Sequence, residues 1–165
     1  MLNLYVERMI RERSTIMGLL KAENVNDSEF DEQVKVCGTV EREADCLPAG
    51  KYRVCIGKCI YHRRKMPFLV PMDSSQCEFC CKARHSHEFG DISAFSSLPC
   101  AMIQPGNGPF TMGRGSILVG EVHAPGYVLK SQPLFTTLYE RIKKAVWRGH
   151  DVTLEIKEMR SEERR

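Results

Sequence analysis

Two polar side chains frame the segment of this chain with the clearest potential for chemistry. Gln104 ends an apolar run that enters a Pro-Gly-Asn-Gly turn, and Ser116 begins a second apolar run that leaves from Gly115. Short strands joined by a glycine-rich loop bring residues at strand ends together, and such loops commonly carry binding and catalytic groups. The pattern therefore predicts a site that contains Gln104 and Ser116.

Ser116 is a candidate nucleophile only if a base can take its proton, because a serine hydroxyl is protonated near neutral pH. Gln104 cannot be that base, since an amide has almost no proton affinity. His123 would reach Ser116 only if the chain folded back between them, because an odd spacing along a strand puts side chains on opposite faces. Cys100, which stands four residues before Gln104, is the alternative nucleophile.

The same stretch resembles a domain family of unknown function from phages and gut anaerobes. Members have a hydrophobic dipeptide, His, any residue and Gly-Asn, then a polar loop and Gly-Cys-Ile-Leu-Val-Gly-Glu. This pair of motifs is similar to a shortened L,D-transpeptidase signature. Gln104 stands at the family's His position and Ser116 at its Cys position. The matching positions are Gly106, Asn107, Gly115, Ile117, Leu118, Val119, Gly120 and Glu121.

Two further segments extend the resemblance over roughly residues 2–157. Residues 47–54 resemble the family's Ile-Pro-Ala-Gly-Thr-Tyr-Lys-Val, and residues 125–139 resemble its helix entry. The resemblance implies an L,D-transpeptidase-like β-sheet fold and peptidoglycan, or a peptide from it, as the ancestral substrate. It also implies a Cys nucleophile with a His base, and this chain has neither at those positions. The binding residues carried over are Gln104, Gly106, Asn107, Gly115 and Ser116.

The apolar pattern predicts a mainly β (α+β) chain. Leu2, Leu4 and Val6 alternate with more polar residues, which is typical of a half-buried strand. We expect this strand to form a hairpin with residues 14–20, although one amphipathic helix over residues 4–20 is the alternative. Further strands are predicted at residues 34–40, 52–61 and 152–156 and on both sides of the glycine-rich loop.

One packed C-terminal helix is predicted after Ser131, which we expect to be its N-cap, with Gly149 just past its end. Its apolar face is expected to comprise Leu134, Phe135, Leu138, Tyr139, Ile142 and Val146. Trp147 is expected to pack rather than to stack on a ligand. We predict a single domain over residues 1–157, with an irregular Cys/His-rich insert at 62–98 and a charged tail at 158–165.

The insert is a candidate zinc site. Cys-x2-Cys followed by a histidine resembles the opening of a zinc knuckle, and a metal crosslink would offset the entropy lost on ordering a long polar loop. The candidate ligands are Cys77, Cys80, Cys81, His85 and His87, with Cys100 as a further donor. Cys55 and Cys59 lie about 13 Å apart on a regular strand, too far for one zinc. Free thiols, or disulfides formed after release from the cell, are the alternatives.

Composition limits the classes of partner. The chain has 165 residues, a net charge of +3 and no apolar run of the ~20 residues that a membrane span needs. This charge is too weak to indicate nucleic-acid binding, which favours strongly basic domains. The N-terminal residues lack the pattern of a secretory signal. We therefore expect synthesis in the cytoplasm, with association with a virion or release on lysis.

The sequence as a whole favours a non-catalytic, degenerate L,D-transpeptidase-like domain with a role in cell-wall recognition or in phage structure. Its expected partner is peptidoglycan or a phage or bacterial protein. Two alternatives stay open. One is an active peptidoglycan-acting enzyme that uses Ser116 or Cys100, and the other is an interaction module stabilised by structural zinc.

Overall fold

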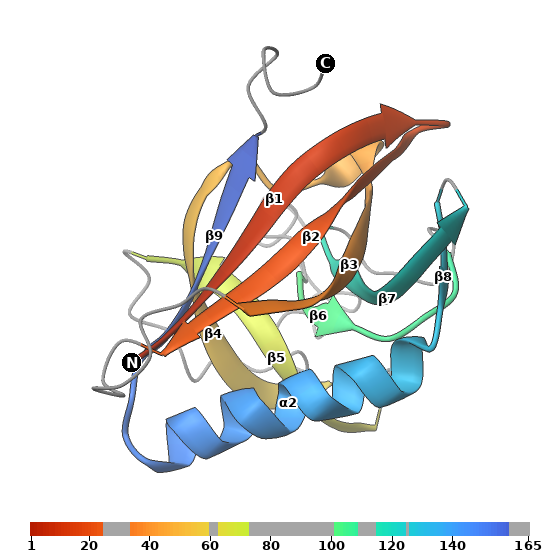
Figure 1. Ribbon diagram of the computed structural model, residues 1–165. Helices are drawn as coiled ribbons and strands as arrows, with labels where there is room; N and C mark the ends of the chain where they lie inside the picture. The colour runs from red at the N-terminus through yellow and green to blue at the C-terminus, as the bar shows by residue number, and fades with distance from the viewer. Residues whose placement is uncertain (25–33, 60–62, 73–100, 109–114, 125, 159–165) are drawn as a thin grey trace, which may run out of the picture.

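The computed structural model describes residues 1–24, 34–59, 63–72, 101–108, 115–124 and 126–158. In this part of the chain, nine strands belong to one sheet (Figure 1). They are β1 (Leu2–Glu12), β2 (Thr15–Asn24), β3 (Val34–Arg42), β4 (Gly50–Cys59), β5 (Arg64–Pro71), β6 (Ile103–Gln104), β7 (Ile117–Ala124), β8 (Tyr127–Leu129) and β9 (Val152–Glu158). A short 3-10 helix η1 (Glu43–Asp45) precedes β4, and the helix α2 (Ser131–Trp147) precedes β9.

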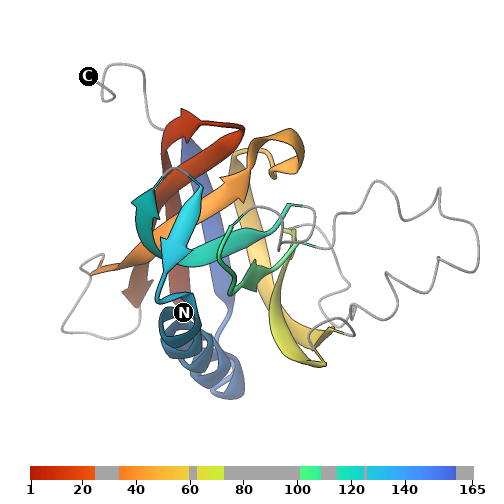
Figure 2. The same cartoon turned by 90° about the vertical axis from the view of Figure 1, so that its right-hand side faces the viewer.

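The sheet curls until its two edges meet. Its strand order is β5-β4-β9-β1-β2-β3-β7-β6, and β8 pairs with β7 beside this path. At the edges, Phe68 and Met102 form an isolated bridge, and the Leu69 N–H donates to the Ala101 carbonyl at 3.0 Å. The result is a barrel-like sheet with α2 across one end (Figures 1 and 2). The prediction of a mainly β chain is confirmed.

The N-terminal segment is a hairpin, as predicted, and not a helix. β1 and β2 pair antiparallel, and the turn between them places Arg13 and Ser14 at φ angles of 53° and 64°. Positive φ at both central residues matches the twist of a two-residue hairpin. The register shifts between Arg8 and Ile10, so β1 carries an irregularity near its end. Such a bulge bends a strand and increases its twist, which suits a curled sheet.

The core lies between the inner face of the barrel and α2. Leu4 and Val6 are fully buried in β1, and Phe135 and Ile142 are fully buried in α2. All four belong to one cluster, so the helix covers the apolar end of the barrel. Burial of each such side chain contributes about 1.5–3 kcal/mol. Among the described residues, no helix has the length and apolar content needed to cross a bilayer.

The C-terminal end of α2 differs in part from its prediction. Gly149 has a φ of 75°, and its N–H donates to the Val146 carbonyl at 3.0 Å, which confirms the predicted stop. The packing predicted for Val146 and Trp147 is wrong, since they are 37% and 84% exposed. Val146 lies in the last turn, and the helical period turns Trp147 away from the stripe that contacts the barrel.

Other differences concern short elements and the helix cap. The stretch 62–98, predicted to be irregular, includes β5, which pairs with β4 along its whole length. The three-residue β8 was not predicted. Lys130, with a φ of 53°, occupies the N-cap position instead of Ser131, which is the first residue of α2. Each of the two strands pairs with the strand that precedes it along the chain, β5 with β4 and β8 with β7.

Candidate functional site

The fold brings the two motif segments together as parallel neighbours. Ile103 of β6 pairs with Ile117 of β7, and Gln104 pairs with Leu118. Ser116 directly precedes Ile117, and side-chain alternation assigns it to the same face as Gln104 and Leu118. The two residues singled out by the sequence therefore lie within two register positions of each other.

Both side chains are enclosed. Gln104 and Ser116 are each 1% exposed. The Ser116 Oγ accepts a hydrogen bond from the Met102 N–H at 3.2 Å, so the hydroxyl serves as a link between the two motif segments. A nucleophile that attacks a polymer needs an open approach as well as a base. Neither Gln104 nor the Met102 amide can take a proton from this hydroxyl.

The glycine-rich loop is held in place by α2 and β8. The Gly106 N–H donates to the Ser131 Oγ at 3.0 Å, and the Ser131 hydroxyl donates to the Val119 carbonyl at 2.5 Å. The Val128 N–H donates to the Asn107 carbonyl at 3.0 Å. Sequence reasoning expected a capping role for Ser131, whereas its buried hydroxyl joins the loop to β7. The retained motif residues thus form a structural joint.

A glycine in β7 allows β8 to pack closely against this strand. A Cβ added at Gly120 would lie 2.9 Å from the Val128 Cβ and 3.0 Å from the Leu129 carbonyl oxygen of β8. Gly115, just before Ser116, has a φ of 73°, a conformation that favours glycine. Close packing and backbone conformation therefore explain why these two positions are glycine, without a role in catalysis.

A hollow of about 460 Å³ lies beside the motif strands. It is lined by Gly120, Glu121 and Val122 of β7 together with residues of β1, β2, β3 and α2, and its lining includes neither Gln104 nor Ser116. The enclosed pair therefore does not open into this hollow.

The described part of the structure does not bring the other candidate nucleophile and base residues together in one site. β7 extends from Ile117 to Ala124, with a register shift against β8 between Val122 and Ala124, and its backbone does not fold back towards Ser116 as a pair of Ser116 and His123 requires. Seven residues of extended chain separate their backbones by roughly 23 Å. The His123 side chain and Cys100 lie outside the described part of the structure.

The predicted zinc ligands also lie outside the described residues, namely Cys77, Cys80, Cys81, His85 and His87. Within the described ranges, no group of three or more His, Cys, Asp or Glu could hold a metal ion.

β4 keeps a regular register with β5 from Tyr52 to Cys59, without the bulge that would bring Cys55 and Cys59 together. Cys55 is disulfide-bonded, whereas Cys59 is buried and takes part in no disulfide.

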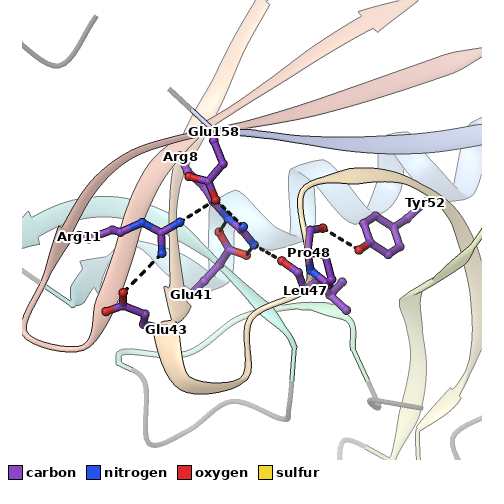
Figure 3. A network of polar contacts seen from close by, with 8 residues as sticks. All are labelled: Arg8, Arg11, Glu41, Glu43, Leu47, Pro48, Tyr52 and Glu158. Atoms are coloured by element: carbon purple, nitrogen blue, oxygen red, sulfur yellow. Dashed lines mark hydrogen bonds and ion pairs between the residues drawn. The ribbon is translucent and has the colours of Figure 1, made fainter. Parts of the chain in front are cut away.

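A buried charge network lies at the end of the barrel remote from α2 (Figure 3). The guanidinium of Arg8 donates two hydrogen bonds to Glu41, from Nε at 2.9 Å and from Nη2 at 2.8 Å. The two side chains are only 3% and 1% exposed. Arg8 also donates to Glu158 at 2.8 Å and to the Leu47 carbonyl at 2.5 Å. The guanidinium thereby joins β1, β3, β9 and the loop before β4.

The sheet order shows how this pair forms. β2 lies between β1 and β3, and in the register Gly18 of β2 stands opposite both Arg8 and Thr39. Gly18 has no side chain, so the Arg8 side chain can extend past β2 to reach Glu41. A Cβ added at Gly18 would lie 2.3 Å from the Glu7 carbonyl oxygen and 3.0 Å from the Thr39 Oγ1.

The rim of the network is more exposed. Arg11 Nη2 donates to Glu158 at 2.6 Å, and its Nη1 lies 3.5 Å from Glu43. Burial would raise the pKa of Glu158, but the hydrogen bonds and positive charges of Arg8 and Arg11 outweigh it, and the pKa is lowered. Sequence reasoning missed this network, although Arg8 continues the inward series of Leu4 and Val6.

Comparison with known proteins found no match to a family model, to a curated protein or to a solved structure.

Proposed function

We propose that this protein is a non-catalytic domain of L,D-transpeptidase-like descent that recognises cell-wall material in a phage-associated setting. The proposal rests on the identity and burial of the residues at two motif positions. Where the resembled family has a His and a Cys, this chain has Gln104 and Ser116, and both are buried within the sheet. The motif keeps its glycines and its hydrogen-bonded loop but has lost the groups that perform acyl transfer.

The chemistry supports this reading over catalysis at Ser116. Acyl transfer needs a deprotonated nucleophile, a base that takes its proton and donors that stabilise the oxyanion. Ser116 has an amide hydrogen bond in place of a base. An enclosed serine with such a partner is better suited to hold strands together than to attack a peptide.

Two alternatives have their own sequence features. A peptidoglycan-acting enzyme would use Ser116 or Cys100, and a zinc-stabilised interaction module would use ligands among Cys77, Cys80, Cys81, His85 and His87. The burial of Ser116 disfavours the first for that residue. Metal analysis of the purified protein tests the second, which requires about one zinc per chain.

The proposal is tested with isolated peptidoglycan sacculi. Purified protein is expected to sediment with the sacculi and to leave their turbidity unchanged. Ser116→Ala and Cys100→Ala are the matched variants, and both should bind like the wild type. A fall in turbidity that either variant abolishes would establish the enzyme, and an absence of binding would remove the role in wall recognition.

A second test measures whether position 116 is open. In a Ser116→Cys, Gln104→His variant, we expect the thiol of residue 116 to react with iodoacetamide far more slowly than Cys46, which is partly exposed. Peptide mass spectrometry distinguishes the two thiols. Rapid labelling at residue 116 in the folded protein would show that an accessible pocket remains.

A further inference from the structure

The C-terminal half of α2 carries a basic surface with an exposed indole ring. We call it the basic face and define it by Arg141, Lys143, Lys144, Trp147 and Arg148. Trp147 is 84% exposed, and the Lys143 Nζ lies 5.7 Å from the centre of its ring. None of these residues belongs to the motif strands or to the network around Arg8.

Two hollows adjoin on this face. One, of about 370 Å³, is lined by Glu140, Arg141, Lys143, Lys144 and Trp147. The other, also of about 370 Å³, has Arg141, Lys144, Arg148 and His150 in its lining. Arg141 and Lys144 line both, so the hollows form a continuous surface along the last turns of α2.

The positive charges of the basic face are not neutralised within the described part of the chain. There, none of Arg141, Lys144 and Arg148 takes part in an ion pair. Glu140 is the acidic residue among the side chains lining the two hollows. The surface therefore has an excess of positive charge that an anionic partner can neutralise.

Helix energetics explain only part of this surface. Cations in the last turn of a helix interact favourably with its dipole, which accounts for Lys144 and Arg148. The same effect does not account for Arg141 and Lys143, which lie further from the helix end, or for the exposure of Trp147. The combination of a flat apolar ring with surrounding cations points to a ligand that has an apolar face and negative groups.

We propose that the basic face binds a carboxylate-bearing glycan chain, with Trp147 stacked on a sugar ring and Arg141, Lys144 and Arg148 paired with carboxylates. The inference rests on the proposed role in cell-wall recognition and names its binding surface. The C–H face of a pyranose ring packs on an indole, as other weakly polarised groups do. Arginine pairs with carboxylates through two parallel hydrogen bonds.

Two other polyanions fit the surface less well. Nucleic-acid-binding proteins usually carry a strongly basic stripe, and those that bind single strands stack successive bases on several aromatic side chains. This chain has a net charge of +3, and its basic face contains one aromatic ring. A helix that lies on a lipid surface inserts its apolar face, whereas the apolar face of α2 is buried against the barrel.

The test uses the intrinsic fluorescence of Trp147, the single tryptophan of the chain. Soluble peptidoglycan fragments that keep their stem-peptide carboxylates are titrated into the full-length protein. We expect the emission to shift to shorter wavelength on binding, because a sugar ring displaces water from the indole. The same fragments with amidated carboxylates should bind at least tenfold more weakly. Lys144→Glu is expected to weaken binding of the acidic fragments about tenfold.

Arg13→Glu is the matched control, since it changes net charge equally in the turn at the far end of the hairpin from α2. It should bind like the wild type.

If fragments bind by calorimetry without any change in emission, or if Lys144→Glu and Arg13→Glu bind equally, the assignment of the binding surface is wrong while the proposed function stands. If no fragment binds, both are wrong. Tighter binding of a single-stranded oligonucleotide or of anionic phosphatidylglycerol vesicles would overturn the assignment of the partner.

Discussion

Arg8 and Glu41 form a buried, doubly hydrogen-bonded ion pair across a strand that separates their own two strands. The bonds of 2.8 and 2.9 Å join β1 to β3, while β2 contributes Gly18 at that level. Burial would lower the pKa of Arg8, but the hydrogen bond and charge of Glu41 outweigh it, and the pKa is raised. The guanidinium of Arg8 is therefore charged, and its burial depends on the partners that it contacts.

Removing one member of this pair should be strongly destabilising. We expect Glu41→Gln to lower the free energy of unfolding by about 3–5 kcal/mol, because it leaves a buried guanidinium without its main partner. Urea denaturation followed by circular dichroism measures the change. Lys21→Met removes the more exposed pair with Glu7, whose separation is 3.1 Å, and should cost less than about 1 kcal/mol.

The double variant Arg8→Met, Glu41→Leu gives the complementary result. With both charges replaced by apolar groups, it should be more stable than Glu41→Gln alone, because no buried charge is left unpaired. If the double variant is destabilised as much as Glu41→Gln or more, the attraction between Arg8 and Glu41 contributes more to stability than the cost of leaving one buried charge unpaired.

Gly18→Ala is expected to disrupt the hairpin. The added Cβ would lie 2.3 Å from the backbone oxygen of Glu7, which cannot move without breaking the β1–β2 pairing. We expect a loss of at least about 3 kcal/mol in unfolding free energy, as for other overpacked sites. In Gly38→Ala the nearest atom is a Val122 methyl carbon at 2.7 Å, so a smaller loss is expected. Similar losses would contradict a special role of Gly18.

The acid sensitivity of the fold should depend in part on Glu158. Its pKa is lowered from an ordinary value of 4.5, so its ionised form stabilises the folded state above that pH. This contribution is lost as the pH falls through the lowered pKa, because the protonated carboxyl no longer attracts Arg8 and Arg11. Because the side chain is 35% exposed, solvent screening limits the contribution to about 1 kcal/mol.

Glu158→Gln tests this dependence. The wild type should be more stable than the variant at neutral pH, and the difference should shrink below about pH 4.5, where the carboxyl of the unfolded chain binds a proton while that of the folded protein still resists it. Thermal unfolding from pH 3 to pH 7 measures both proteins. A difference that stays constant over this range would show that ionisation of Glu158 does not contribute.

Ser131→Ala should loosen the glycine-rich loop. It removes a hydroxyl that accepts from Gly106 and donates to Val119, so two backbone groups lose their partner. We expect a loss of about 1–3 kcal/mol and faster amide exchange at Gly106. Thr137→Ala is the matched control, because its hydroxyl bonds to Pro133 on the exposed side of α2. Unchanged exchange at Gly106 would argue against Ser131 as the joint.

The sequence predicted which strands carry the candidate site but not how its side chains are buried and bonded. The motif pattern predicts that the segments of Gln104 and Ser116 are strands beside a glycine loop, and β6 and β7 are adjacent. The enclosure of both side chains depends on packing by distant segments, which a local pattern does not contain. The links made by Ser131 depend on where α2 begins relative to β7.

Features that depend on neighbours along the chain could be predicted from the residues alone. The alternation of Leu2, Leu4 and Val6 specifies an inward-facing strand, and Gly149 ends α2, because periodicity and backbone preference act over a few residues. In contrast, the pairing of Arg8 with Glu41, the closure of the sheet at Phe68 and the exposure of Trp147 arise in the folded protein and could not be predicted from local pattern. These features join segments that lie far apart in the sequence, so they depend on how the sheet curls and how α2 docks on it.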